Sequence, residues 1–328
     1  MLGYTLRRVV QSAIVIFVLT LVIFFGIWLV GNPADALISP DASLSERAAA
    51  MAALGLDQPI WRQYLDFLSG LVQGDLGNSF VYREPVANIL LSRLPASLEL
   101  GFVAFMIAVS ISIPLGLYAG LKPHSRISQG VMGLSLIGVS IPQFWLGMVL
   151  IIVFGITLSV LPVGGRGDTA TFLGITSSIW TLDGLLHLIL PAINMALLKM
   201  SLLIRVTRAA VMEVSKLEYV TFAAAKGVRR RRIVTHHILR NVLLPIVTVL
   251  GIEMGNLIAY AVITETVFSW PGVGRLLISS IQVLDRPMIL AYLCFTAVLF
   301  IGLNLVVDIL YTFIDPRVRD AIHAGSAK

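Results

Sequence analysis

The sequence predicts an all-α integral membrane protein with six transmembrane helices. Hydrophobic residues make up 57% of the 328 positions and charged residues 13%, whereas about 25% of the residues in a typical soluble domain are charged. The mean hydropathy is +0.91. The apolar residues also gather in long runs, and an α-helix needs about 20 such residues to cross a bilayer.

Six apolar runs follow one another along the chain. We expect membrane-spanning helices at residues 9–30, 98–121, 130–158, 185–206, 244–263 and 288–314. A basic start precedes the first run, and Ala34-Asp35-Ala36 imitates a signal-peptide cleavage site. The run is nevertheless longer than the apolar core of a signal peptide, which has about 7–15 residues. We therefore expect an uncleaved first helix.

The spacing of these runs divides the chain into three parts. Residues 1–97 contain the first helix and a polar, acidic outer-face subdomain, residues 98–314 form a core of five helices, and residues 315–328 form a tail. Within the subdomain we expect two amphipathic helices, one near residues 44–54 and one directly after Pro59. Cys294 is the single cysteine, so no intrachain disulfide can form.

The basic residues predict the orientation of the helices. Six spans place both termini on one side of the membrane, and most of the 24 Lys and Arg residues lie in the termini and loops of that side. Because cytoplasmic loops carry the excess of Lys and Arg, we expect both termini in the cytoplasm. The net charge of +6 then reflects topology, and the run Arg229 to Arg232 is not expected to bind nucleic acid.

The longest polar interruption between two spans is residues 217–245, LEYVTFAAAKGVRRRRIVTHHILRNVLLP. Its first part has apolar residues at helical spacing, which predicts a short helix. Gly227 stands where that helix would end, because glycine accepts the left-handed cap conformation. Arg229 to Asn241 can form a second short helix, and Pro245 suits the first turn of the next span.

This interruption resembles the cytoplasmic coupling loop of ATP-binding-cassette importer permeases, whose signature is EAA, three residues, G, and later LP. Thr221, Phe222 and Ala223 occupy the EAA positions, Gly227 the glycine, and Leu244-Pro245 the end. The acid and the first alanine are absent and the spacer is longer, and both departures are similar to the peptide/nickel subfamily. Further segments resemble that subfamily: GLDQP (55–59), GDLGNS (74–79), SIPQFW (140–145), ETVFSWPGVGR (265–275) and DPRVR (315–319).

The resemblance implies a type I ABC importer permease fold in a bacterial inner (cytoplasmic) membrane. It implies a heterodimer with a second, homologous permease subunit, two cytoplasmic ATP-binding subunits and a periplasmic substrate-binding protein. Dipeptides or short oligopeptides are the expected substrates, although permeases for nickel, glutathione, haem and opines share the scaffold. The sequence has no G-x-x-x-x-G-K-[ST] phosphate loop, so ATP and Mg are expected on the partner ATPase subunits.

The chain itself is therefore expected to be a transport subunit and not an enzyme. Neither H-E-x-x-H nor a Cys/His metal-binding spacing occurs in the sequence, so no metal site is expected. By resemblance, the residues that couple to the ATPase are Glu218, Tyr219, Thr221, Ala223, Ala224, Lys226, Gly227 and Arg229.

An outer loop and a cavity are expected to handle the substrate. By resemblance, the outer gate and the contact with the binding protein use Glu265, Phe268, Trp270, Pro271, Gly272 and Arg275, with Phe268 and Trp270 as apolar anchors at the membrane surface. The candidates for the translocation cavity are Glu253, Asn256 and Gln143.

Glu253 is the clearest cavity candidate, because ionisable groups within spans are costly and often functional. The alternative is a protonated Glu253 that bonds a neighbouring helix. We expect Lys199, near the inner end of the fourth span, to extend its ammonium to the membrane interface. Two rival functions remain: an ion-coupled secondary transporter with Glu253 as its proton site, and a membrane scaffold without transport.

Overall fold

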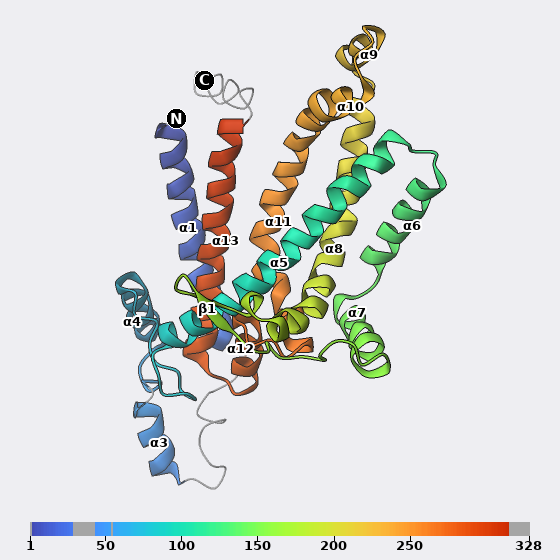
Figure 1. The fold of residues 1–328 in the computed structure, drawn as a ribbon. Helices are drawn as coiled ribbons and strands as arrows, with labels where there is room; N and C mark the ends of the chain where they lie inside the picture. Colours follow the sequence, from blue (N-terminus) through green and yellow to red (C-terminus); the bar gives the residue numbers. More distant parts are fainter. Residues whose placement is uncertain (1, 29–42, 54, 315–328) are drawn as a thin grey trace. The chain divides into compact units, whose positions relative to one another are not determined.

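The computed structural model describes residues 2–28, 43–53 and 55–314, and it is mostly helical (Figure 1). The chain divides into two compact units. Unit 1 comprises Met1–Ser97 and Pro271–Ile301, and unit 2 comprises Leu98–Trp270 and Gly302–Lys328. The predicted tail at residues 315–328 and the segment Ala34-Asp35-Ala36 lie outside the described residues.

Unit 1 joins the first helix to the predicted subdomain and to a later part of the chain. Its helices are α1 (Leu2–Trp28), α3 (Leu44–Ala53), α4 (Ile60–Gln73), the start of α5 (Val86–Leu121), α12 (Val273–Gln282) and the first part of α13 (Arg286–Ile314). The two predicted amphipathic helices are confirmed as α3 and α4. Ser43 and Glu46 form a capping box at α3, and the hydrogen bonds from Ser43 lower the pKa of Glu46.

A small apolar core holds α1, α4 and α13 together. It contains Phe24, Ile27, Tyr64, Ile289 and Leu290. The segment after α4 is fixed to the start of α13 by Asp285, which accepts hydrogen bonds from the Ser79 hydroxyl and from the Phe80 amide, the latter at 3.1 Å. The subdomain is thus tied to residues about 200 positions later in the sequence.

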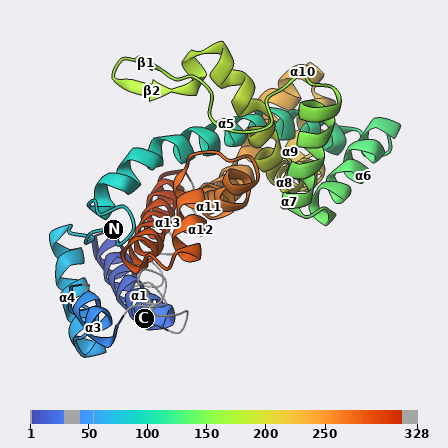
Figure 2. The ribbon, with the colours of Figure 1, turned by 90° about the horizontal axis from the view of Figure 1, so that it is seen from below.

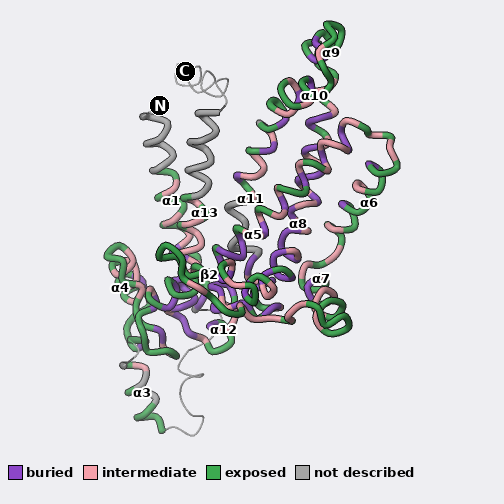
Figure 3. Tube along the Cα trace, viewed as in Figure 1, coloured by how far each residue is buried: buried purple, intermediate pink, exposed green. Residues whose placement is uncertain are grey.

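Unit 2 is built around α8, which packs against α6, α7, α11 and η2. In chain order its elements are the rest of α5, α6 (Arg126–Ser140), α7 (Gln143–Leu150), the π-helix η1 (Ile151–Thr157), β1 (Ala170–Phe172), β2 (Ile175–Ser177), the 3-10 turn η2 (Ser178–Trp180), α8 (Leu182–Val214), α9 (Glu218–Ala225), α10 (Arg230–Arg232), the π-helix η3 (Ile233–Ile238), α11 (Leu239–Val267) and the last part of α13. Figure 3 shows buried residues along α8 and exposed residues over α9.

Small residues let α5 approach α8 closely. A Cβ atom added to Gly116 would lie 2.5 Å from Cβ of Thr207, and one added to Gly120 would lie 2.5 Å from Cβ of Val211. Such small-residue contacts are typical of helices that pack in membranes. The antiparallel β1–β2 hairpin pairs Phe172 with Ile175 and extends away from α6 and α7 (Figure 2).

The described helices bear out only part of the six predicted spans. Among the described residues, three helices are long and apolar enough to cross a membrane, and up to five if each bent pair counts as one. The third span, predicted as one helix over residues 130–158, is broken into α6 and the α7–η1 pair, which are bent by 107°. Ile141 precedes Pro142 and is extended, with φ −88° and ψ 126°, because proline disfavours the helical conformation of the residue before it.

Candidate functional site: a helical elbow at one end of unit 2

The chain leaves α8 and forms a short elbow, which we define as α9 with the following residues through η3. α9 ends at Ala225, and Gly227 has the left-handed φ of 74°. A Cβ atom at Gly227 would meet nothing within 4 Å, so glycine is needed here for backbone conformation and not for space. The predicted short helix and its glycine cap are confirmed.

The second half of the elbow differs from the prediction. Arg229 to Asn241 does not form a separate short helix, because α10 and η3 continue directly into α11. Pro245 lies inside α11 and not in its first turn. Since proline removes one backbone donor and crowds the preceding turn, the helix bends instead: the segments on either side of Leu244 meet at 46°.

One face of α9 is packed against its own chain. Val220 and Ala223 are buried in a core with Ile233, Ile238 and Val242. The small residue Ala223 therefore lets η3 and α11 approach α9, whereas the sequence interpretation assigned it to the approach of a partner. The packed face attaches α9 to η3 and the start of α11.

The other face of α9 is open. Most of the predicted coupling residues are exposed on α9 or directly after it, namely Glu218, Tyr219, Thr221, Ala224, Lys226, Gly227 and Arg229. Of these, Tyr219 directs its hydroxyl to its own chain and not to the open face. Phe222 is 62% exposed, and the Lys226 ammonium lies 4.5 Å from the centre of its ring. Phe222 occupies an EAA position of the resemblance but was not among the predicted coupling residues, and its exposed ring adds apolar surface to this face.

The structure pairs the charged cavity candidate with a lysine. Lys199 of α8 and Glu253 of α11 form an ion pair, and their side chains are 5% and 14% exposed. The expectation that Lys199 extends to the membrane interface is therefore wrong. The alternative was a protonated Glu253 that bonds a neighbouring helix. Glu253 does contact the neighbouring helix α8, and it does so through an ion pair with the Lys199 side chain. The side chain of Asn256 lies outside the described residues.

Gln143 belongs to a separate polar cluster. Its amide nitrogen donates to the Thr264 hydroxyl at 2.8 Å, and the amide nitrogen of Asn194 donates to the same oxygen at 3.2 Å. Asn194 and Thr264 are buried. The structure thus assigns Gln143 and Glu253 to different neighbours.

The predicted outer gate is more buried than expected. Glu265, Phe268 and Trp270 are fully buried, and α11 extends through Val267, so the break between helices comes later than the sequence suggested. The Phe268 carbonyl accepts a 2.8 Å hydrogen bond from the Gly165 amide. Phe268 and Trp270 therefore pack inside the chain and do not stand at a membrane surface as anchors.

The remaining gate residues belong to unit 1. Pro271 is partly exposed, Gly272 is buried as the N-cap of α12, and Arg275 is exposed. Among the predicted gate residues that the structure describes, Arg275 is the most accessible to a partner.

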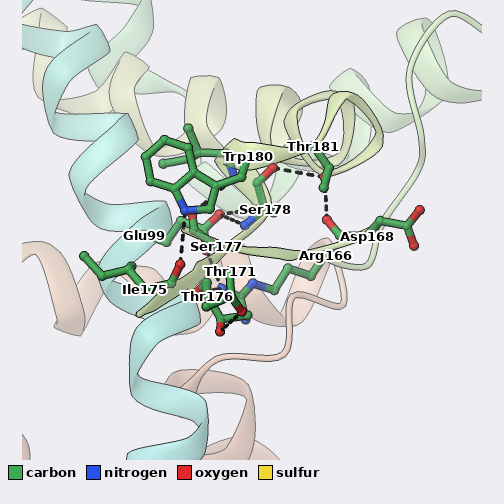
Figure 4. Close-up of polar contacts among 11 residues, drawn as sticks. Glu99, Arg166, Asp168, Thr171, Ile175, Thr176, Ser177, Ser178, Trp180 and Thr181 are labelled. Carbon is green, nitrogen blue, oxygen red and sulfur yellow. Dashed lines mark hydrogen bonds and ion pairs between the residues drawn. The ribbon is translucent and has the colours of Figure 1, made fainter. Parts of the chain in front are cut away.

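A charged clamp at the opposite end of α8 was missed by the sequence analysis (Figure 4). Glu99 of α5 forms an ion pair with Arg166 and accepts hydrogen bonds from the amide and the hydroxyl of Ser178. Thr181 adds a 2.6 Å bond from its hydroxyl to the Asp168 carbonyl. An acid within an apolar run was the available signal, but nothing in the sequence identified Arg166 and Ser178 as its partners.

Comparison with known proteins gives matches over nearly the whole chain. Residues 1–101 match the N-terminal model of binding-protein-dependent transport system membrane components, and residues 112–320 match the model of the binding-protein-dependent transport system inner membrane component.

Individual relatives cover the same length. The dipeptide transport system permease protein DppB of Escherichia coli (strain K12) is 38% identical over 336 residues, which is 97% of this chain and 99% of the relative. The di/tripeptide transport system permease protein DppB of Pseudomonas aeruginosa is 39% identical with the same coverage. The oligopeptide transport system permease protein AppB of Bacillus subtilis is 36% identical over 97% of this chain and 100% of the relative. The chain therefore belongs to the family of binding-protein-dependent transport system inner membrane components.

Proposed function

We propose that the chain is the permease subunit of an importer that carries dipeptides or short oligopeptides across the bacterial inner membrane. In this proposal separate ATPase subunits supply the energy and bind ATP and Mg, and a periplasmic binding protein delivers the substrate. A second, homologous permease completes the pathway. The chain would cross the membrane six times, with both termini in the cytoplasm.

The observation that carries this proposal is the open face of α9. The helix is held by its buried side, while Phe222 and the neighbouring polar residues are presented to a partner. An ATPase that binds this face differently in its open and closed states would shift the permease between its own two states. The relatives named above supply the class of substrate.

The ion-coupled rival receives less support. It requires Glu253 to take up and release a proton during transport. Lys199 forms an ion pair with that carboxylate, which gives Glu253 a role in joining α8 and α11 that needs no proton transfer. Uptake by vesicles that contain this chain, driven by a proton gradient without ATPase subunits, would nevertheless establish the rival.

Gly227→Trp is the sharpest single test. The indole would project from the elbow into open space, because nothing of the chain lies within 4 Å of its Cβ position, so we expect membrane insertion to be kept. The left-handed φ costs an L-residue about 1–2 kcal/mol. We expect ATP-dependent uptake to be lost because the bulky group obstructs the partner.

Gly227→Asn is the matched control, because asparagine tolerates the left-handed conformation and is smaller. It should keep most of the uptake, measured with a labelled dipeptide in proteoliposomes that contain the complete complex. Normal uptake by the Gly227→Trp protein would contradict the proposal. Competition by peptides of increasing length, glutathione, haem and nickel would then define the substrate class.

A further inference from the structure

The contact between α9 and the start of α11 has an apolar part and a polar part. The apolar part consists of Val220 and Ala223 against Ile233, Ile238 and Val242. Hydrophobic packing is not directional, so this part alone would allow α9 to slide or rotate over its support when a force acts on it.

The polar part is a closed set of three groups. The Tyr219 hydroxyl donates to the His237 carbonyl at 3.2 Å. The side-chain amide of Asn241 donates to the Tyr219 oxygen at 2.8 Å and to the same His237 carbonyl at 2.8 Å. Hydrogen bonds weaken steeply as their angles depart from linearity, so these bonds fix the position of α9 relative to η3 and the start of α11.

The carbonyl that receives both bonds lies in an unusual part of the backbone. His237 belongs to the π-helix η3, and π-helical turns within α-helices are rare and frequent at functional sites. The ring of His237 also lies 6.4 Å from the ring of Tyr219, measured between their centroids. Tyr219 is thus in contact with the one segment of the elbow where the helix is widened.

The helix that begins at this junction continues into the middle of unit 2. α11 carries Glu253, which pairs with Lys199 of α8, and Thr264, which receives the bonds from Gln143 and Asn194. α11 continues from its start through the bend at Pro245 to these residues, so a displacement of its start would be passed along the helix to the contacts that join α8, α7 and α11.

We propose that Tyr219 is a positioning residue: through Asn241 and the His237 carbonyl it locks α9 to α11, so that a push on α9 moves α11 instead of sliding over it. This inference rests on the proposed function, because it assigns a role in the coupling of an ATPase to transport. A positioning role differs from a docking role, because the Tyr219 hydroxyl is hydrogen-bonded within its own chain and does not point to the open face where a partner would bind.

The test uses the complete complex in proteoliposomes and three measurements: co-purification of the ATPase subunits, ATP hydrolysis, and uptake of a labelled dipeptide. For Tyr219→Phe we expect assembly and hydrolysis to be kept, while the ATP hydrolysed per dipeptide imported rises at least about 3-fold. The variant removes both hydrogen bonds of the phenol oxygen, and one net hydrogen bond alone corresponds to a factor of about 2 to 13. Asn241→Ala should give a smaller rise, because it removes the bond from Asn241 to Tyr219 and keeps the one from Tyr219 to the His237 carbonyl. The double variant should match Tyr219→Phe, because that variant already removes both bonds that reach α9.

Tyr118→Phe is the matched control, because it removes a phenol hydroxyl from α5 in the same unit and keeps the ring beneath the Lys122 ammonium. It should leave the ratio unchanged. If Tyr219→Phe hydrolyses the same amount of ATP per dipeptide as the parent, the inference is overturned and the proposed function stays intact. Loss of the ATPase subunits on purification of Tyr219→Phe would overturn it too, by making Tyr219 a docking contact. If the parental complex imports without ATP, the proposed function fails and this inference fails with it.

Discussion

The ion pairs Glu99–Arg166 and Lys199–Glu253 both lie in unit 2, and their surroundings differ. Glu99 also accepts bonds from the amide and the hydroxyl of Ser178, so a helix and a loop are held by several bonds at one point. Lys199 and Glu253 join two long helices, α8 and α11, within predicted spans. The first pair is part of a clamp, and the second is a contact between two helices that the proposed mechanism needs to move.

The difference shows that a buried charge can serve two purposes in unit 2: Glu99 fixes a loop at the start of α8, and Glu253 joins α11 to α8 within the predicted spans. A buried charge is tolerated when its hydrogen-bonding capacity is filled, and removing one partner is costly because the other is left uncompensated. The Glu99 carboxylate meets this condition with several groups and should be rigid, whereas the Nε of its partner Arg166 is buried without a hydrogen bond to any of the described residues. The pair in the spans joins two long helices and not a helix and a loop, which makes it the better candidate for a contact that forms and breaks.

Breaking the clamp should have the largest effect. Glu99→Ala leaves Arg166 and the amide of Ser178 without their carboxylate, which costs about 3–5 kcal/mol for a buried pair and corresponds to a 100-fold or greater rise in local opening. We expect that rise in hydrogen exchange of the peptide covering residues 175–181.

Two variants serve as controls for this measurement. Glu99→Gln keeps the shape and some of the hydrogen bonds, so its effect should be smaller. Glu213→Ala removes an exposed acid of α8 and should leave the exchange unchanged. Equal exchange in Glu99→Ala and the parent would show that the loop is held by other contacts.

Breaking the pair in the spans should have an intermediate effect that a second change reverses. Lys199→Met leaves Glu253 without its cation, and a charged side chain near the centre of a span costs about 2.5–3.5 kcal/mol. Adding Glu253→Gln removes the stranded charge and should restore most of the stability, because apolar or neutral replacements of a whole buried pair are often neutral. Thermal unfolding of the purified protein in detergent measures both.

A double variant that is less stable than Lys199→Met would contradict this view of the pair. The Glu253 side chain would then stabilise the fold by more than the neutralisation of Lys199. If the double variant is stable but imports poorly, the pair serves transport and not folding, which is the distinction that the proposed function requires.

The smallest expected effect concerns the helix cap beside the clamp. The Thr181 hydroxyl accepts a 3.0 Å bond from the Gly184 amide at the start of α8. Thr181→Ala should cost about 1 kcal/mol, or roughly a 5-fold rise in exchange at the first turn of α8. Thr181→Ser keeps the cap and should match the parent. An effect of Thr181→Ala as large as that of Glu99→Ala would mean that the cap, and not the carboxylate, holds the loop.

Much of the architecture could be predicted from local patterns. Hydrophobicity alone predicted a helical membrane protein, and the amphipathic spacing after Pro59 gave α4. Gly227 marked the end of α9 because few other residues accept its φ of 74°. The break at Pro142 had a local cause as well, yet the apolar run on both sides concealed it, since hydrophobicity does not distinguish a straight span from one bent by 107°.

By itself the sequence determined the class of the protein, its family and the place of the elbow, because these depend on composition and on motifs that are local in the chain. Only the tertiary structure decided which charges meet: Lys199 with Glu253, and Glu99 with Arg166 and Ser178. It also decided that Phe268 and Trp270 are buried and that Tyr219 turns toward Asn241. The physical reason is that ion pairs and burial depend on which helix faces which, and residues 54 to 79 positions apart acquire that relation only when the helices pack.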